Sequence, residues 1–320
     1  TLTDKKGNPI RDATIEITVN GRSYDKITDE KGSVSLGLNL DSGIYSVVVK
    51  FKGLPNYTPI TKHANVTIEP TVKGLDVVKM FRNSTQYYAI FTDSQGNFLK
   101  NKNVQFNING VFYTKTTNDK GIAMMGINLN PGKYIITAKN LVTGEQSSNI
   151  ITVKSLIVQK DLTKYYLNAS RFQTTIYNKD GSLAVNKEVT FNINGVFYHR
   201  TTDSNGVASL GISLRPGEYI ITTMVDELAI GNKVTVLPTL VTKNLNMKYL
   251  DGSSFTAQTL DGQGKPLANQ NVSFNVNGVF YYKVTDNNGI AKLNIRLMPG
   301  EYIITSCWNN FQTGNTIWIF

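Results

Sequence analysis

Three lysine–asparagine pairs are the residues of this chain whose types and spacing suit covalent bond formation. A lysine amine kept neutral by burial can attack the side-chain amide of a neighbouring asparagine, which forms an isopeptide bond and releases ammonia. Each asparagine precedes an alternating apolar segment and follows its lysine by about 70 residues. The candidate pairs are Lys79 with Asn149, Lys160 with Asn232, and Lys243 with Asn315.

This chemistry also requires a protonated carboxyl group that polarises the amide. No acid recurs at one inward position, since Asp93 and Asp261 correspond to Asn178. The alternative interpretation is that the lysines are surface residues and that the asparagines form hydrogen bonds at a strand edge. Both interpretations remain open at the level of sequence. Cross-linking further requires the first and last strands of one domain to lie side by side.

Catalytic and metal-binding signatures are absent from the sequence. No G-x-S-x-G, H-E-x-x-H or phosphate-binding glycine loop occurs, His63 and His199 are far apart, and the single Cys307 excludes an internal disulfide. A recurring T-D/N-x-x-G string suggests calcium, but Asn118 replaces the acid once and a calcium cage needs six or more oxygen ligands. Turn formation explains the string better. We therefore expect a protein that is not an enzyme and that holds no cofactor or metal.

Two further groups of residues are candidates for modification or contact. Five Asn-x-Ser/Thr sequons could accept glycans, and two of them fall in expected loops. Three aromatic residues in expected loops could stack on sugar rings or pack within their domains, and two at the end of the sequence could pack on a partner or a following domain. The sequons begin at Asn56, Asn65, Asn83, Asn168 and Asn271, and the aromatic residues are Tyr57, Trp308, Phe311, Trp318 and Phe320.

One string of eight residues recurs four times and defines the elements that position these residues. FNINGVFY occurs at 106–113 and 191–198, FNVNGVFY at 274–281 and ITVNGRSY at 17–24. Its Asn-Gly pairs start at Asn20, Asn109, Asn194 and Asn277, so they are 89, 85 and 83 residues apart. The same order of turns and apolar segments surrounds each copy. We therefore predict four repeats of one domain, with the boundaries 1–72, 73–154, 155–237 and 238–320.

The pattern inside each repeat predicts an all-β fold. Segments such as VTFNING alternate apolar and polar residues with a period of two, and Asn-Gly between two such segments indicates a tight hairpin. Turn signals every eight to twelve residues predict an antiparallel sandwich with an immunoglobulin-like plan. A tyrosine after each Pro-Gly turn is expected to bond a nearby backbone group, as in a tyrosine corner. These tyrosines are Tyr45, Tyr134, Tyr219 and Tyr302.

The joints between repeats are short and contain no flexible spacer, which predicts four tandem β-sandwich repeats in an extended rod. The first repeat offers only Thr1–Thr3 ahead of its first turn and is expected to lack its first strand. A sandwich without that strand exposes unpaired backbone and core. Either the sequence is a piece of a longer array, or a neighbouring chain donates the missing strand and builds a filament.

The formal net charge of +10 is spread along the chain. Such a charge could attract anionic polymers, or it could simply keep a long molecule solvated. No apolar run has the roughly 18 residues that a membrane helix needs and no signal peptide is evident, so we expect a segment without membrane contact. Only the second repeat is notably basic, with Lys100, Lys102, Lys115, Lys120, Lys133 and Lys139.

The combined motif resembles known surface proteins. The segment LDGQGKPLANQNVSFNVNGVFYYKVTDNNGIAKLNIRLMPGEYIIT is similar to the tandem Ig-like repeats of adhesin-like proteins from methanogenic archaea, and its T-D-x-x-G … L-x-P-G-x-Y core resembles the B-type repeats of Gram-positive collagen adhesins. The resemblance implies an extracellular cell-surface setting and a role as an adhesin or stalk. B-type repeats often carry a Lys–Asn cross-link with a glutamate helper after the Y-x-I-T strand, where this chain has Ala138, Thr223 and Ser306.

Three functions follow as hypotheses. The first is an adhesin or stalk segment, the second a filament subunit joined by strand donation, and the third a carbohydrate-binding repeat array. The expected partners are a polysaccharide or protein on the surface of another cell, or neighbouring copies of the chain itself. A nucleic acid is not an expected partner.

Overall fold

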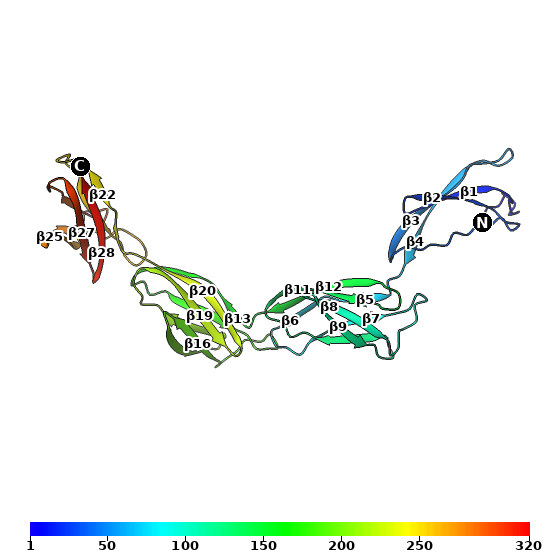
Figure 1. Ribbon diagram of the computed structural model, residues 1–320, viewed down its shortest axis with the longest axis horizontal. Helices are drawn as coiled ribbons and strands as arrows, with labels where there is room; N and C mark the ends of the chain where they lie inside the picture. Colours follow the sequence, from blue (N-terminus) through cyan, green and yellow to red (C-terminus); the bar gives the residue numbers. More distant parts are fainter. The chain divides into compact units, whose positions relative to one another are not determined.

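A computed structural model describes residues 1–320, and every regular element in it is a β-strand (Figure 1). The chain divides into two compact units, Thr1–Lys154 and Ser155–Phe320. We keep the names repeat 1 to repeat 4 for the four ranges defined from sequence.

The first unit contains one single-layered and one two-layered group of strands. Repeat 1 forms a four-stranded sheet of order β2-β1-β3-β4, and repeat 2 forms a three-stranded sheet of order β10-β7-β5 and a five-stranded sheet of order β6-β12-β11-β8-β9. The strands are β1 (Thr14–Val19), β2 (Arg22–Ile27), β3 (Gly43–Phe51), β4 (Ile60–Ile68), β5 (Val72–Gly74), β6 (Val77–Met80), β7 (Gln86–Phe91), β8 (Asn103–Ile108), β9 (Val111–Thr116), β10 (Ile122–Gly126), β11 (Gly132–Lys139) and β12 (Gln146–Lys154).

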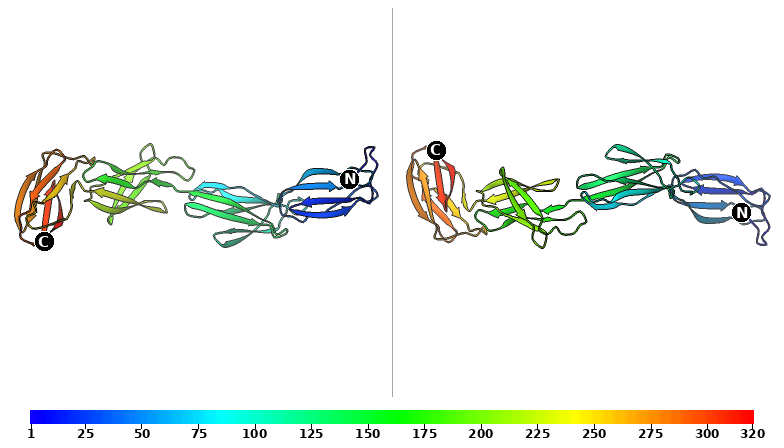
Figure 2. Two further views of the ribbon diagram at one scale, coloured as in Figure 1. Left: turned by 90° about the horizontal axis from the view of Figure 1, so that it is seen from above. Right: turned by 90° about the horizontal axis from the view of Figure 1, so that it is seen from below.

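The second unit contains the same two-layered arrangement twice. The sheet orders are β13-β15-β18 with β14-β20-β19-β16-β17, and β21-β23-β26 with β22-β28-β27-β24-β25. The two layers of each sandwich are visible in the views of Figure 2. The strands are β13 (Ile157–Gln159), β14 (Leu162–Tyr165), β15 (Arg171–Ile176), β16 (Glu188–Ile193), β17 (Val196–Thr201), β18 (Val207–Gly211), β19 (Gly217–Val225), β20 (Leu228–Leu237), β21 (Leu240–Thr242), β22 (Leu245–Met247), β23 (Ser254–Thr259), β24 (Asn271–Val276), β25 (Val279–Val284), β26 (Ile290–Asn294), β27 (Gly300–Trp308) and β28 (Phe311–Ile319).

The predicted hairpin and tyrosine corner are both confirmed. Asn109 and Gly110 have φ values of 53° and 76°, as a type I′ turn requires, and the other three Asn-Gly pairs are also left-handed. The hydroxyl groups of the four corner tyrosines donate to the carbonyl oxygen four residues earlier. These bonds run from Tyr45 to Asp41 (2.8 Å), Tyr134 to Asn130 (2.8 Å), Tyr219 to Arg215 (2.8 Å) and Tyr302 to Met298 (2.9 Å).

The core of each complete sandwich is centred on the phenylalanine of the recurring string. Phe106, Phe191 and Phe274 are fully buried, because strand alternation directs them between the layers. In repeat 3 the ring of Phe191 meets that of Phe172 from the facing sheet edge-on, at 5.9 Å and 88°, and repeats 2 and 4 contain the same kind of pair. Such contacts add to the area-dependent stabilisation of the core.

The first strand of each complete repeat is divided between the two sheets. In repeat 2, β5 pairs antiparallel with β7 in the three-stranded sheet, and the chain then crosses so that β6 pairs parallel with β12. The last strand of a repeat therefore lies beside the second part of its first strand, as the sequence analysis required. Repeats 3 and 4 make the same crossing.

Repeat 1 lacks more than its first strand. The segment 33–37, which corresponds to β10, forms no strand, and Thr1–Thr3, which correspond to the end of β7 and the residue after it, contribute only an isolated bridge from Thr3 to Pro9. Residues 1–71 therefore form no three-stranded sheet. The core of repeat 1, which includes Ile15, Ile17 and Phe51, is covered on one side only by partly buried residues such as Leu2, Val34 and Leu36.

Candidate functional site

The proposed cross-link partners are not in contact in repeat 2. Lys79 is only 5% exposed, and its Nζ donates to the carbonyl oxygens of Thr85 (3.1 Å) and Ile127 (2.8 Å). Burial lowers the pKa of Lys79, which favours the neutral amine that the reaction needs. Lys79 nevertheless lies opposite Val153 in the parallel pairing of β6 with β12, four residues beyond Asn149.

The lysines of the other two pairs occupy a different position. Lys160 and Lys243 are exposed residues between the two parts of the first strand, not on the second part. The third residues of β14 and β22, which correspond to Lys79, are Lys164 and Met247. The alignment of Lys79 with Lys160 and Lys243 was therefore wrong. Lys164 repeats the contacts of Lys79, donating to Ser170 O (3.2 Å) and Ile212 O (2.7 Å).

The three asparagines instead form hydrogen bonds that join the last strand to the residues between the two parts of the first strand. Asn232 Nδ2 donates to Asp161 Oδ1 (2.7 Å), and the same carboxylate oxygen accepts from the next backbone N–H, that of Lys233 (2.9 Å). Asn149 with Asp76, and Asn315 with Asn244, make equivalent pairs of bonds. We call this arrangement the asparagine clasp. It corresponds to the alternative interpretation, in which these asparagines form hydrogen bonds at a strand.

The sequons differ in how open their asparagines are. Asn56, Asn65 and Asn271 are exposed, in the loop before β4, on β4 and at the start of β24. Asn83 is half-buried in a turn, where its Oδ1 accepts from the Thr85 N–H (2.9 Å). Asn168 Nδ2 donates to Gly262 O of repeat 4 at 2.5 Å, so a glycan there would break a contact between two repeats. Glycosylation of these residues stays a prediction.

The aromatic candidates fall into two groups. Trp308 packs against the core of repeat 4 and donates from Nε1 to Gln270 Oε1 (3.3 Å), and Phe311 packs on Tyr166 of repeat 3 with ring centroids 5.7 Å apart. These two rings therefore have structural contacts already. The rings that remain exposed are Tyr57 (38%), Trp318 (53%) and Phe320 (56%).

The T-D/N-x-x-G strings form side-chain-stabilised turns. Oδ1 of Asp29 accepts from the N–H groups of Lys31 and Ser33, both at 2.8 Å, and Asn118, Asp203 and Asp286 do the same in their repeats. The hydrogen bond from Ser33 is the main reason why the pKa of Asp29 lies below its usual range. No group of three or more His, Cys, Asp and Glu side chains is placed to hold a metal ion.

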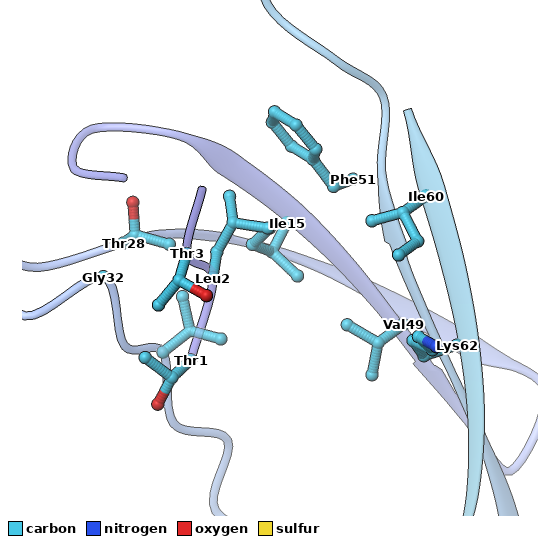
Figure 3. Close-up of a pocket in the computed structure, with 11 residues that line it drawn as sticks. Thr1, Leu2, Thr3, Ile15, Thr28, Gly32, Val49, Phe51, Ile60 and Lys62 are labelled. Atoms are coloured by element: carbon cyan, nitrogen blue, oxygen red, sulfur yellow. The ribbon is translucent and has the colours of Figure 1, made fainter. Parts of the chain in front are cut away.

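Repeat 1 carries an open apolar groove of about 260 Å³ where its missing layer would lie. Figure 3 shows the side chains of Ile15, Val49 and Ile60 around the space between the Thr1–Thr3 segment and strands β3 and β4. The free edge of β4 adjoins this groove, because repeat 1 has no counterpart of β6 to pair with it. Groove and free edge together have the features of a strand-acceptor site.

The joint between repeats 1 and 2 is held by hydrogen bonds of Glu145, together with those of Asn140 and Thr143 to Thr71. Glu145 accepts from Ser42 Oγ of repeat 1 (2.5 Å), from the backbone N–H of Thr71 (2.5 Å) and from Thr71 Oγ1 (2.6 Å). Ser42 stands where the later repeats have proline. Burial, the largest effect, raises the pKa of Glu145, but the three hydrogen bonds outweigh it and leave the pKa below its usual value.

Sequence comparison relates the chain to bacterial adhesins. It is 26% identical to intimin of Citrobacter freundii over 284 residues, which is 77% of this chain and 28% of intimin. It is 23% identical to the inverse autotransporter adhesin YeeJ of Escherichia coli K12 over 348 aligned positions, which cover 91% of this chain and 14% of YeeJ. No family model matches the chain. The chain thus shares weak similarity with adhesins over most of its own length and spans less than a third of theirs.

Comparison with solved structures returns proteins built from tandem sandwiches. The titin I9–I11 tandem covers 78% of this chain and 98% of its own, with 15% identity and a TM-score of 0.30. Invasin, a bacterial integrin-binding protein, covers 100% of this chain and 74% of its own, with 14% identity and a TM-score of 0.24. Because both scores are below 0.5, the fold assignment depends on the strands described above. The chain has no helix of the length and apolarity needed to cross a membrane.

Proposed function

We propose that this chain is a segment of an extracellular cell-surface adhesin, in which tandem Ig-like sandwiches provide reach and contact with other cells or surfaces. The observation that supports this most directly is the similarity to two adhesins over 77% and 91% of the chain. The repeated sandwich and the short hydrogen-bonded joint at Glu145 suit a stalk. The comparisons are with bacterial adhesins and do not bear on archaeal proteins or collagen adhesins, so the narrower resemblance stays a hypothesis.

Small-angle scattering of the chain tests the stalk. A compact protein of 320 residues would have a radius of gyration of about 20 Å. Nine-residue strands are roughly 30 Å long, so four sandwiches end to end would give a radius of gyration of about 35 Å or more. We expect the larger value. A radius near 20 Å would contradict the proposal that these residues provide reach.

A second candidate function is strand acceptance in an extracellular filament. The open groove and the free edge of β4 in repeat 1 favour it. Sedimentation at increasing protein concentration tests it: strand donation between copies predicts assemblies that disappear in the variant Val49→Lys, since a charge would then lie in the groove. A monomer at all concentrations would refute this candidate and leave the stalk proposal untouched.

A further inference from the structure

The edge strands that carry the V-F-Y string present an aromatic ring and a cation side by side. Strands β9, β17 and β25 each pair on one edge only, with β8, β16 and β24. Figure 1 labels β9 and β25. Residues two apart on a strand point to the same face and lie roughly 6.6 Å apart. In each of these strands a tyrosine and a base have that spacing, and we call each pair a ledge: Tyr113 with Lys115, Tyr198 with Arg200, and Tyr281 with Lys283.

The ledge side chains lie on the face of the five-stranded sheet that packs on the core, but the three-stranded sheet does not cover them. Tyr113 is opposite Phe106 and Lys115 is opposite Val104, and both of these partners are fully buried core residues. Tyr113 itself is nevertheless 40% exposed, and Tyr281 is 38% exposed. The three-stranded sheet is too narrow to reach the outer strand. A ring that faces inward therefore remains in contact with solvent.

The bases of the ledges have no acidic partner. In repeat 3, Lys187 pairs with Asp226 and Lys233 with Glu218, whereas Arg200 lies over the Tyr198 ring, with its Cζ 6.0 Å from the ring centroid, and donates only to a backbone carbonyl. Neither Lys115 nor Lys283 forms an ion pair. The ledges of repeats 2 and 4 are thus exposed rings beside a positive charge without an ion pair, and in repeat 3 the ring is half-buried with Arg200 over it. The chain as a whole has a net charge of +10.

Repeat 1 has the same arrangement although its hairpin differs in sequence. Tyr24 and Lys26 occupy the two ledge positions on β2, opposite Ile17 and Ile15. A cleft of about 470 Å³ adjoins Tyr24 but not Lys26, and it is also lined by Arg22, Val19, Asn20 and the segment 37–40. The aromatic–base pair is therefore present in all four repeats, including the one that has lost V-F from the string.

We propose that the ledges bind an acidic polysaccharide, with a sugar ring stacked on each tyrosine and its carboxylate paired with the neighbouring base. This inference rests on the proposed adhesive function, for which it names the class of partner. The apolar face of a sugar ring suits an exposed aromatic ring, and an uncompensated cation within about 7 Å suits a carboxylate on the same sugar. Several weak sites on one chain bind a polymer with avidity.

A second copy of the chain is a poorer occupant of the ledges than a polysaccharide. Two like edge strands would bring bases of equal charge together, and charged side chains on edge strands oppose strand pairing. Acidic polysaccharides supply the missing negative charge at regular intervals along a chain without a folded surface of their own.

Binding of the full chain to three polymers tests the proposal. The probes are polygalacturonate, which has both rings and carboxylates, dextran, which has rings only, and polyglutamate, which has carboxylates only. We expect polygalacturonate to bind at low salt, to bind at least about tenfold more tightly than either control polymer, and to be released as salt rises. Equal affinity for polyglutamate would overturn the proposal, because charge alone would then explain binding, and so would a preference for single-stranded DNA.

Matched variants assign the binding to the ledges. The ledge variant is Lys115→Gln, Arg200→Gln, Lys283→Gln, and the control variant is Lys120→Gln, Lys160→Gln, Lys265→Gln. Each removes three positive charges, one from each of repeats 2, 3 and 4, and all three control lysines are exposed. We expect a loss of about tenfold or more for the ledge variant and less than about threefold for the control. A further variant with threonine at the three tyrosines should also lose binding while keeping its β-sheet circular dichroism. Equal losses in the ledge and control variants would refute the ledges, without affecting the scattering result that tests the stalk.

Discussion

Lys79, Lys164 and Met247 occupy the same buried position in repeats 2, 3 and 4. A lysine at position 247 would therefore place a positive charge in the core of repeat 4. The contacts of Lys79 and Lys164 allow its effect on the free energy of unfolding to be estimated. In repeats 2 and 3 the lysine ammonium bridges two backbone carbonyl groups. In repeat 4 the corresponding residues are Ser253 and Ile295, and there the N–H of Ile295 donates directly to Ser253 O at 3.4 Å. Repeat 4 therefore has the corresponding backbone segments but no lysine between them, and the Ser253 carbonyl already accepts one hydrogen bond.

We predict that Met247→Lys lowers the free energy of unfolding of repeat 4 by only about 0–2 kcal/mol. Taking an ammonium group out of water costs several kcal/mol. Hydrogen bonds from a charged donor return about 1.5–3 kcal/mol each, so two of them offset roughly 3–6 kcal/mol of that cost. The methylene groups of lysine fill the volume that the methionine side chain leaves. Ile317→Lys, at a fully buried site of the same repeat without this pair of acceptors, is the matched control and is expected to unfold repeat 4.

Tryptophan fluorescence during urea unfolding measures this effect in the full chain. Both tryptophans, Trp308 and Trp318, belong to repeat 4, so their signal reports that repeat alone. The expected result is a cooperative transition at slightly lower urea for Met247→Lys and no transition for Ile317→Lys. If both variants lack the transition, the two carbonyl groups do not hold the ammonium and the reasoning is refuted.

The pH dependence of Met247→Lys gives a second measurement of the same prediction. Burial lowers the pKa of Lys79 and of Lys164 from the usual 10.5, and the same burial would act on a lysine at position 247. Between the lowered folded pKa and 10.5 the unfolded state binds more protons, so the stability of the variant rises with pH in that interval relative to the unchanged protein. A difference between the two proteins that does not vary with pH would mean that the ammonium reaches water.

Three other substitutions and one mass measurement test separate parts of the structure. Tyr302→Phe removes the bond to Met298 O and should cost repeat 4 about 1 kcal/mol in the fluorescence assay, whereas an unchanged midpoint would show that the corner is dispensable. Asn277→Val places a β-branched residue at φ 51° and should cost about 1–2 kcal/mol, with Asn277→Gly nearly neutral as its control. Glu145→Gln should speed hydrogen exchange at the Thr71 amide; because the folded pKa of Glu145 is lowered, this protection is complete above about pH 4.5 and is lost as pH falls through the lowered pKa. The intact mass should equal the sequence mass, and the loss of one ammonia or more would contradict the separation of the lysines from the asparagines.

The elements specified by local chemistry could be predicted from the sequence. Asn-Gly needs left-handed φ at both residues, and the tyrosine after each Pro-Gly turn, or after Ser-Gly in repeat 1, bonds a carbonyl four residues away, so both follow from short strings. The T-D-x-x-G turn was interpreted correctly for the same reason, since the Asp203 side chain accepts from the N–H groups two and four residues ahead. Each of these features depends only on residues that are close together in the sequence. Comparing the repeats is therefore enough to recognise them.

The features that depend on the crossing of the first strand could not be predicted. Lys79 was grouped with Lys160 and Lys243 because all three fall in the predicted first strand. That prediction took the first strand as one element. Dividing it between two sheets moves the buried position to the second part, where Lys164 and not Lys160 is found. Similarly, the short segment ahead of the first turn of repeat 1 suggested one missing strand, whereas the segment 33–37 also forms no strand and repeat 1 forms a single four-stranded sheet.

The asparagine clasp explains why three repeats differ at two positions that face each other. In repeat 2 the Tyr87 hydroxyl donates to Asn149 Oδ1 (2.8 Å), and a side chain at Gly74 would collide with both groups. In repeats 3 and 4 phenylalanine replaces this tyrosine, and the residue at the glycine position supplies the lost bond. Gln159 Nε2 donates to Asn232 Oδ1 (2.8 Å), and Thr242 Oγ1 donates to Asn315 Oδ1 (2.6 Å).

Each of repeats 2, 3 and 4 therefore provides one donor to the clasp oxygen, from either the second strand or the first. A half-buried amide oxygen without a donor would cost about 1–3 kcal/mol, which is a sufficient reason for the two positions to vary together. Burial, with the negative charge of Asp76, raises the pKa of Tyr87 to about 12, so its hydroxyl keeps its proton and remains a donor throughout the physiological range. The amide of each asparagine is consequently occupied on both its oxygen and its nitrogen. The position that first suggested a covalent bond is thus explained by a hydrogen-bonded junction between the first and last strands.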